Sequence, residues 1–358
     1  MTQDMTREVP GLFAQPKGKS SRDYSKEKSW GKNIFNSSFP ASLVAYMYSK
    51  GMDTIYLKAT PEGIGHSSLS GKDLLKINPL SDFAFFNYEA GFSSFDQFYE
   101  GDREKIDLVM IDRESNTDLI GLEIKLTAIP DSTTKKYDED HYGCEMVVRP
   151  PTICFIACTI CNCFIGKEGR QILKDLLGDI RQINHWEEID AVLPHYGDIL
   201  EALKRVCRHL EDRQTPIIVQ PIWKTVGSKP TLAEDCLDVF VWSNLAIVRL
   251  CMLQETDKKI TRFMRTVIWI YRMLFEYSVY GQFDYKRIVR LHSYNIANDK
   301  AFAVSGVQTW PIMKSAELSH PRISKLEIKN IILGGGQNML SPERRFDAVI
   351  VNSPDLFD

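Results

Sequence analysis

The sequence predicts one α/β domain that contains a helical insertion. Two apolar segments, residues 106–112 and 119–127, have the character of strands and are separated by a polar turn at residues 114–118. Residues 169–213 instead carry apolar side chains three and four positions apart, which is the spacing of helices. β-type segments return after residue 300, and no repeat or evident linker divides the chain. These observations indicate strands on both sides of a helical region within one domain.

The first elements lead up to the predicted hairpin. Residues 1–30 are rich in lysine, serine and glycine, so they predict a mobile basic arm. The elements expected after the arm are a helix at 33–49 that begins or is interrupted at Pro40, a strand at 54–58, and helical turns at 69–77 and 92–99. The two helical turns flank an aromatic segment, and the hairpin follows them.

The second half of the chain is predicted to be mostly helical before it returns to strands. A polar loop at 129–143 leaves the hairpin. The elements expected after the loop are helices at 172–180, 199–210, 232–253 and 259–280, then β-type segments at 301–307, 325–333 and 346–351. The predicted organisation is an arm of residues 1–30 and a single domain of residues 31–358, with a core at 50–165, a helical region at 167–280 and a β-rich segment at 300–358.

Composition limits the classes of protein to which the chain can belong. Hydrophobic residues make up 44% of the chain and charged residues 25%, which is typical of a folded globular protein rather than a disordered one. The formal net charge of −3 gives no overall attraction for nucleic acid, although local basic patches and a metal ion could still hold phosphates. The chain has no long uncharged apolar segment and no signal pattern at its N-terminus, so we expect a cytoplasmic protein without membrane association.

A charged pair lies on one side of the second predicted strand. Because strand side chains alternate, Glu123 and Lys125 share one face, while Leu122 and Ile124 share the other. Burying such charges is costly unless a partner compensates them. Asp107, on the preceding apolar strand, could supply a second carboxylate across the hairpin. The alternative is a solvent-facing Glu–Lys ion pair on an edge strand, which would carry no chemistry.

Two converging carboxylates and a lysine suit the hydrolysis of a phosphodiester bond. Carboxylate oxygens are ligands that Mg²⁺ prefers, and bound Mg²⁺ lowers the pKa of a coordinated water. Asp107 and Glu123 would hold the ion, helped by the backbone carbonyl of Ile124. Lys125 would orient or deprotonate the attacking water, with its own pKa lowered by the neighbouring cation. The residues therefore indicate a nuclease and leave both roles of Lys125 open.

An aspartate, a hairpin and then Glu-x-Lys on consecutive strands resembles the PD-(D/E)XK nuclease superfamily. The segments GLEIKLTAIPDSTT (121–134) and SPERRFDAVIV (341–351) are similar, more specifically, to the HindVP-type family of type II restriction endonucleases. The resemblance implies a mixed central β-sheet flanked by helices, a restriction-endonuclease-like core, with residues 50–165 as its catalytic part. Ile106 replaces the proline that can precede the aspartate, a departure that is frequent in the superfamily.

The resemblance also implies an activity and its partners. Carried over by position, Asp107 and Glu123 are metal ligands and Lys125 is the catalytic lysine. The implied reaction is a Mg²⁺-dependent cut of double-stranded DNA at a short palindromic site, GRCGYC-like for the family, by a homodimer whose two-fold axis matches that of the site. A cognate DNA methyltransferase is the implied genetic partner in a restriction-modification system.

Two further polar groups are candidates for contact with DNA. Hydroxyls and lysines on the loop after Glu123 could meet phosphates, which position a protein without reading sequence. Arginines near the C-terminus could read guanine in the major groove. The candidates are Ser132, Thr133, Thr134, Lys135, Lys136, Arg344 and Arg345. A solvated loop is the alternative for the first group, and a salt bridge to Glu343 or Asp347 is the alternative for the arginines.

Additional ligands for a metal are also conceivable from the sequence. Glu89 or Glu104 could add a third carboxylate but would otherwise be surface residues, and Asp347 is a rival metal ligand. A separate group of thiols consists of Cys154, Cys158, Cys161 and Cys163. Its C-x3-C-x2-C-x-C spacing differs from the paired knuckles of zinc modules, so we favour buried free thiols over a metal site.

Two other functions are compatible with these residues. A repair or mobile-element nuclease of the same superfamily would use the same site but recognise DNA structure rather than sequence. A non-catalytic DNA-binding or zinc-bearing interaction protein would hold Glu123 and Lys125 merely as an ion pair. Incubation with plasmid DNA and Mg²⁺ would separate the three, through discrete fragments, smeared or structure-dependent nicks, and no cleavage, respectively.

Overall fold

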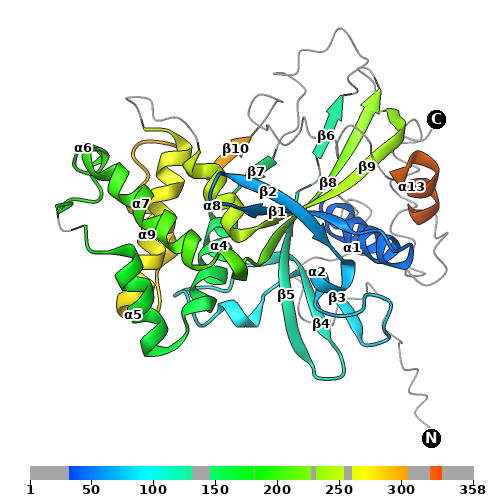
Figure 1. Cartoon of the computed structure of the whole chain (residues 1–358), viewed down its shortest axis with the longest axis horizontal. Coiled ribbons are helices and arrows are strands. Elements are labelled where there is room, and N and C mark those ends of the chain that lie inside the picture. Colours follow the sequence, from blue (N-terminus) through cyan, green and yellow to red (C-terminus); the bar gives the residue numbers. More distant parts are fainter. Residues whose placement is uncertain are drawn as a thin grey trace, which may run out of the picture.

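The computed structural model describes residues 32–125, 127–130, 146–180, 182–226, 231–253, 260–304 and 323–332. Its centre is a twisted sheet, with one group of helices beside it on the left in Figure 1 and a smaller group on the right. The strands are β1 (Thr54–Ala59), β2 (Ile64–Leu69), β3 (Ala84–Ala90), β4 (Ile106–Asp112), β5 (Thr117–Ile124), β6 (Thr127–Pro130), β7 (Met146–Val148), β8 (Pro216–Val226), β9 (Thr231–Ser243), β10 (Phe302–Val304) and β11 (Ile323–Ser324).

The described helices fall before, within and after the strands. The α-helices are α1 (Lys32–Ser49), α2 (Gly71–Leu75), α4 (Pro150–Cys161), α5 (Gly166–Leu177), α6 (Ile189–Val192), α7 (Tyr196–His209), α8 (Asn244–Met252), α9 (Arg262–Tyr280), α10 (Tyr285–Leu291) and α13 (Lys325–Ile332). The 3₁₀ turns are η2 (Ser93–Phe95), η3 (Asn162–Phe164), η4 (Leu193–His195) and η5 (Glu211–Arg213).

The central sheet is mixed. Its strand order is β2-β1-β9-β8-β5-β4-β3, with β11 paired to β9 and β6 paired to β8. β1 runs parallel to β9 and β5 runs parallel to β8, whereas β3, β4 and β5 form an antiparallel meander. The predicted fold class, an α/β protein with helices on a mixed sheet, is therefore confirmed.

Each face of the sheet is covered by a hydrophobic core. The first core lies between the sheet and the larger helical group, which includes α4, α5, α7 and α9 (Figure 1). The second core lies between the opposite face and α1, α2 and α13. Because both faces are buried, the central strands carry apolar side chains on both sides rather than a clean alternation.

Several predicted elements are confirmed by the structure. β4 has the predicted bounds, and β5 follows it as the second strand of the hairpin. The helix predicted at 33–49 is α1, which continues through Pro40, and the one predicted at 259–280 is α9. The helical region predicted at 167–280 is helical in α5 to α7 and again in α8 and α9, but the sheet strands β8 and β9 lie between them and the region is not continuous.

The helix predicted at 232–253 is wrong, because the segment forms β9 and then α8. β9 is paired on both sides, by β1 and β8, and its apolar residues therefore have no simple period. No glycine or proline separates the strand from the helix. The boundary is set by Ser243, whose side chain accepts a hydrogen bond from the backbone N–H of Ala246 and caps α8.

The strand predicted at 325–333 is also wrong, because its described residues, Lys325–Ile332, form α13. Ser324 and Glu327 form a reciprocal capping box: the hydroxyl of Ser324 accepts from the Glu327 N–H, and the Glu327 carboxylate accepts from the Ser324 N–H. This local pattern outweighs the β-branched residues that follow it. Of the other β-type segments, 301–307 contains β10, and 346–351 lies outside the described residues.

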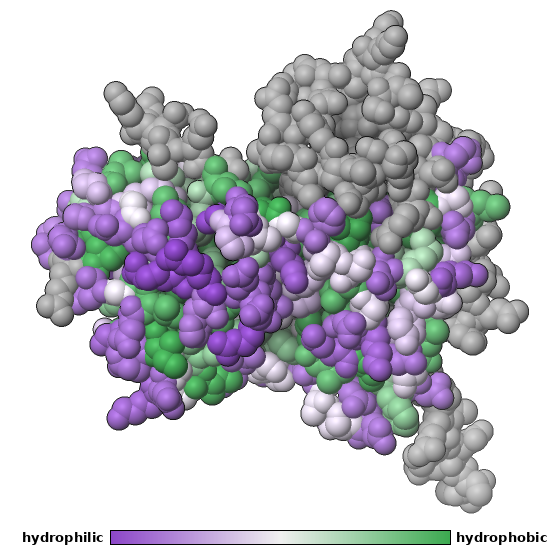
Figure 2. Space-filling model, viewed as in Figure 1, coloured by the Kyte–Doolittle hydropathy of each residue, from purple (hydrophilic) through white to green (hydrophobic). Residues whose placement is uncertain are grey.

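The surface in Figure 2 mixes hydrophilic and hydrophobic residues over the helical group and over the sheet. Among the described residues, no single helix is both long and apolar enough to cross a membrane. Two consecutive helical segments, Pro150–Phe164 and Gly166–Leu177, would together be long and apolar enough, but they are bent by 116° relative to each other. The predicted arm at 1–30 lies outside the described residues, and the single domain remains a prediction.

Candidate active site

The structure brings Asp107, Glu123 and Lys125 together at one end of the β4–β5 pair. Leu108 faces Leu122 across the two strands, so Asp107 and Glu123 are the next residues in register. The ammonium nitrogen of Lys125 lies 2.6 Å from Glu123 Oε2 and 3.8 Å from Asp107 Oδ2. The three side chains predicted to act together are thus within direct reach of one another.

Backbone contacts fix this arrangement. Asp107 Oδ2 accepts a hydrogen bond from the backbone N–H of Ile124 at 2.8 Å, which ties the carboxylate to the neighbouring strand. The backbone N–H of Lys125 donates to the carbonyl of Val219 at 2.9 Å, so β8 holds the chain where β5 ends. Because β5 lies between β4 and β8, the Glu123–Lys125 pair is not on an edge strand. The solvent-facing alternative therefore does not describe this pair.

The site opens to solvent from the Asp107 side. The side chain of Glu123 is 7% exposed, that of Lys125 is 17% exposed and that of Asp107 is 31% exposed. On the same face of the sheet, Ile218 stands opposite Glu123 and belongs to the first core. The carboxylate of Glu123 is thus buried, that of Asp107 is partly exposed, and the exposure of Lys125 is intermediate between them.

Burial and neighbouring charges set the protonation of the site. Burial raises the pKa of Glu123 to about 7, and the carboxylate of Asp107 contributes to the rise while Lys125 opposes it. Burial lowers the pKa of Lys125, but the carboxylates of Glu123 and Asp107 outweigh burial, so that its pKa is raised. This direction is opposite to the one expected beside a bound cation. Without a cation, Lys125 is charged at neutral pH.

The donor set of the site fits a hard divalent cation. The ammonium of Lys125 already sits between two carboxylates, which shows that the site gathers positive charge at that point. Carboxylate oxygens and a backbone carbonyl suit Mg²⁺, which takes few protein ligands and keeps several waters. No group of three His, Cys, Asp or Glu side chains within the described ranges could hold a metal. The set predicted from the sequence, Asp107, Glu123 and the carbonyl of Ile124, has the oxygen ligands that such an ion takes.

The other acidic residues considered as metal ligands are Glu89, Glu104 and Asp347, and only Glu89 lies next to Asp107 in the sheet. Glu89 on β3 stands beside Asp107 in the sheet, between the pairs made by Tyr88 and Ala90, and has a left-handed φ of 47°. Glu104 is bound elsewhere: it accepts a hydrogen bond from Tyr285 and pairs with Lys286 at 3.1 Å. That cluster faces α10 rather than the Asp107–Glu123 pair. Asp347 lies outside the described residues.

The thiols of the cysteine group lie in and just after α4. Cys154, Cys158 and Cys161 are buried in the first core, and Cys163 is half-buried. Burial raises the pKa of each of these thiols. They are free cysteines, and the neutral thiol is a small apolar group that suits a helix packed inside a core.

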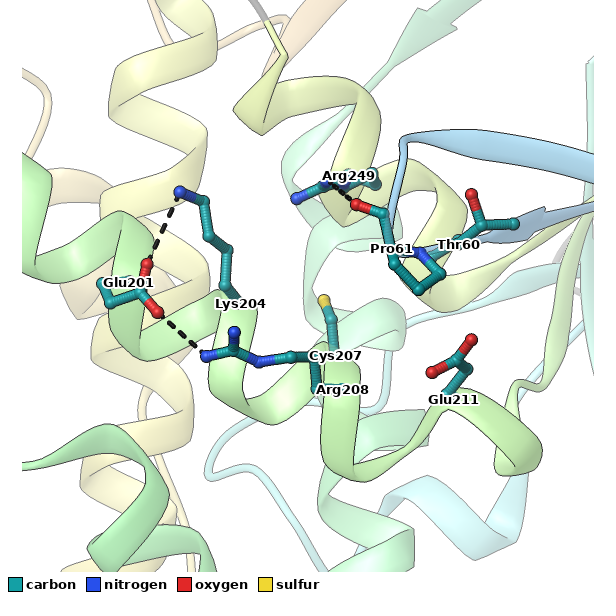
Figure 3. A pocket seen from close by; sticks show the side chains of 9 residues that line it. Thr60, Pro61, Glu201, Lys204, Cys207, Arg208, Glu211 and Arg249 are labelled. Carbon is teal, nitrogen blue, oxygen red and sulfur yellow. Dashed lines mark hydrogen bonds and ion pairs between the residues drawn. The ribbon is translucent and has the colours of Figure 1, made fainter.

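A cavity of about 310 Å³ lies away from these residues, between the β1–β2 hairpin and helices α7 and α8 (Figure 3). Four of its charged side chains already have partners. Lys204 and Arg208 both pair with Glu201, at 3.5 Å and 2.9 Å, and Arg249 donates to the carbonyl of Pro61 at 2.8 Å. The cavity therefore adds nothing to the chemistry of the site.

The proposed DNA contacts are not tested by the structure. The hydroxyl and lysine candidates at 132–136 and the arginines at 344 and 345 lie outside the described residues. Arg149, which sequence reasoning missed, carries a positive charge that opposes, as the smallest of several causes, the raised pKa of Lys125. In the sequence, Arg149 is recognisable only as a basic residue in front of two prolines that begin a helix. This pattern does not indicate how far the residue lies from Lys125.

Comparison with known proteins agrees with the geometry. The family model described as HindVP restriction endonuclease matches residues 30–357. The type II restriction enzyme HgiDI of Herpetosiphon aurantiacus is 39% identical over 353 residues, which cover 98% of this chain and 97% of the relative. The probable type II restriction enzyme HindVP of Haemophilus influenzae is 41% identical over 352 residues, covering 97% and 95%. No solved structure matches the chain. The extent of these matches shows that the chain belongs to the HindVP restriction endonuclease family.

Proposed function

We propose that this chain is a Mg²⁺-dependent type II restriction endonuclease that hydrolyses phosphodiester bonds in double-stranded DNA at a short palindromic site. The observation that carries the proposal is the convergence of Asp107, Glu123 and Lys125. Family membership supports it, because both relatives are named type II restriction enzymes. We further propose that the protein acts as a homodimer, that its target is GRCGYC-like, and that a cognate DNA methyltransferase is its genetic partner.

The residues of the site have separable roles in this reaction. Bound Mg²⁺ would neutralise phosphate charge and supply an acidified water. Asp107 and Glu123 would hold the ion, and the carbonyl of Ile124 would complete the protein's share of its ligands. The hydrogen bond from the Ile124 N–H keeps Asp107 oriented toward the site before any substrate arrives. Such preorganisation reduces the rearrangement needed when DNA binds.

The role of Lys125 depends on its protonation. With its pKa raised by two carboxylates, the side chain is an ammonium that can donate hydrogen bonds to a water or to a phosphate oxygen. It can accept a proton only after the positive charge of a metal has offset those carboxylates. The raised pKa therefore favours Lys125 as a hydrogen-bond donor to the water or phosphate, and allows general-base action only where a bound metal would offset those carboxylates.

Digestion of DNA tests the proposal directly. Full-length protein incubated with plasmid and phage DNA in Mg²⁺ is expected to give discrete fragments, and sequencing of their ends would reveal the site and the position of the cut. Chelation of the metal should stop cleavage. Smeared products or structure-dependent nicks would instead favour a repair or mobile-element nuclease, and intact DNA at every site would contradict the proposal.

The metal requirement is expected to depend on pH. Glu123, with a pKa of about 7, must lose its proton before it can bind a cation. Above pH 8 the carboxylate is ionised and Mg²⁺ binding is independent of pH at this group. With this pKa, the Mg²⁺ concentration for half-maximal cleavage should rise roughly twofold from pH 8 to pH 7 and about fivefold from pH 7 to pH 6. Mg²⁺ titrations of the cleavage rate at pH 6, 7 and 8 measure this shift, and identical midpoints would contradict it.

A further inference from the structure

Gln220 is a buried polar residue of β8 that lies next to Lys125 in the sheet. β8 runs between β5 and β9 (Figure 1). In the parallel pairing of β5 with β8, Ile124 stands opposite Val219. The pairing continues past the end of β5, because the backbone N–H of Lys125 donates to the carbonyl of Val219 at 2.9 Å. The next residue of β8, Gln220, is therefore the register neighbour of Lys125.

Gln220 and Lys125 also point to the same face of the sheet. The ammonium of Lys125 lies 2.6 Å from Glu123 Oε2, so the two charged side chains share one face. Ile218 stands opposite Glu123 and belongs to the first core, and Gln220 follows it by two residues on the same strand. Because neighbouring strands lie about 4.8 Å apart, the stem of Lys125 and the side chain of Gln220 begin beside each other.

Trp242 fixes the orientation of the Gln220 amide. The indole N–H of Trp242, on β9, donates a hydrogen bond to Gln220 Oε1 at 2.7 Å. Both side chains are buried, with exposed fractions of 0% for Gln220 and 1% for Trp242. The neighbours of Gln220 on the same face of β8, Ile218 and Ile222, are apolar. Because a buried amide costs free energy that an apolar side chain does not, the core alone does not require a glutamine here.

The ammonium of Lys125 is directed away from β8. It turns toward β4, where Asp107 Oδ2 lies 3.8 Å away. A lysine has a flexible four-carbon stem, so it could also extend in other directions from the end of β5. Gln220 occupies the β8 side of that stem, and its amide has no charge that would compete with the two carboxylates for the ammonium. Its fixed orientation limits the directions that the stem can take.

We propose that Gln220, held by Trp242, is a positioning residue that keeps the ammonium of Lys125 directed toward Glu123 and Asp107. The inference rests on the nuclease function proposed above, in which Lys125 orients the attacking water or the phosphate. Gln220 is fully buried, so it acts through the lysine rather than by touching DNA. A donor that gains conformational freedom spends less time in the reactive geometry, and the rate of the reaction falls.

Single-turnover cleavage rates of two variants provide the first test. Gln220→Met keeps the length of the side chain but removes the amide, and it should lower the rate roughly tenfold. Trp242→Phe keeps an aromatic ring but removes the N–H that orients the amide, and it should lower the rate roughly three- to tenfold. Trp269→Phe is the matched control with an unchanged rate, because it removes another buried indole N–H, which donates to the carbonyl of His292 in the helical group.

A double-mutant cycle separates an effect on Lys125 from a general effect on the fold. In a Lys125→Met protein the side chain to be positioned is absent, so adding Gln220→Met should change the remaining rate by less than about twofold. A tenfold loss in both backgrounds would mean that the amide acts independently of the lysine and would overturn the assignment. Cleavage by Gln220→Met at the rate of the unaltered protein would overturn it as well.

The ammonium can also be observed directly, in the metal-free protein without DNA. In protein labelled with ¹⁵N-lysine, an ammonium held between two carboxylates exchanges its protons slowly and gives a ¹H–¹⁵N signal, which is identified by its absence from Lys125→Met. This signal should weaken strongly or disappear in Gln220→Met and in Trp242→Phe, and it should remain in Trp269→Phe. An unchanged signal in the first two variants, or no Lys125 signal in the unaltered protein, would contradict the inference.

The two readouts distinguish failure of this inference from failure of the proposed function. If the unaltered protein cuts no DNA, the proposed function fails, and the ¹⁵N signal still decides whether Gln220 positions Lys125. If the unaltered protein cuts and Gln220→Met cuts equally well, only the role of Gln220 is lost. Should Gln220→Met fail to fold, as judged by circular dichroism, Trp242→Phe leaves the glutamine in place and is used for both tests.

Discussion

Replacing Glu123 by glutamine is expected to lower the rate of DNA cleavage by a factor of roughly 10³ or more while the protein stays folded. The amide keeps the shape of the side chain but removes the negative charge that a cation requires. It also takes away the nearest partner of Lys125, which lies 2.6 Å away. The measurement is fragment formation from plasmid DNA in a single turnover, with protein in excess.

Glu201 provides a matched control for this substitution. Its carboxylate also pairs with a lysine, Lys204, but the pair is exposed on α7 and borders the separate cavity in Figure 3. Glu201→Gln should therefore cleave at the wild-type rate. Circular dichroism and thermal unfolding of both variants would verify that they fold. A Glu123→Gln protein that cuts DNA normally would refute the proposed metal site.

Replacing Lys125 by methionine is expected to produce a loss of similar size, roughly 10³-fold. Methionine fills most of the space of the lysine stem without its charge. The change removes the group that lowers the pKa of Glu123, so this pKa should rise further above 7. At pH 7 the site would then hold a proton in place of the cation, and the water would lose its orienting donor.

Raising the pH separates the two contributions of Lys125. A rise to pH 9 shifts Glu123 of Lys125→Met toward its ionised form, so that the deficit caused by a protonated Glu123 shrinks. The deficit that remains at pH 9 and saturating Mg²⁺ measures what the lysine does to the water and phosphate. Lys204→Met on α7 is the control and should retain full activity. Full recovery of Lys125→Met at high pH would exclude a direct catalytic role for the lysine.

Much of the candidate site could be predicted from local sequence. The β4–β5 hairpin has a polar turn between its strands, so its presence follows from residues that are close together in the chain, although the strand predicted at 119–127 is β5 at Thr117–Ile124. Once the register is given, Asp107 and Glu123 must be neighbours. The alternation of Leu122 and Ile124 with Glu123 and Lys125 predicted correctly which side chains share a face.

Other parts of the fold could not be predicted in this way. β8 contains Pro216 and Pro221, which normally argue against a central strand, yet it pairs with both β5 and β9. β9 and α8 are both apolar and meet at Ser243 without a turn. Whether each segment forms a strand or a helix depends on the elements that pack against it. That information is not contained in the local pattern of either segment.

The amino-acid order alone determined the hairpin and the identity of its three polar residues, because both depend on residues near one another in the chain. The nuclease family was indicated by the motifs that these residues form and shown by matches along nearly the whole chain. The tertiary structure decided how deeply Glu123 is buried and why the pKa of Lys125 is raised in the absence of a cation. These properties arise from β8, α4 and the first core, which are brought to the site from distant parts of the chain. Solvent exclusion and charge proximity are three-dimensional quantities, and only the packed protein has them.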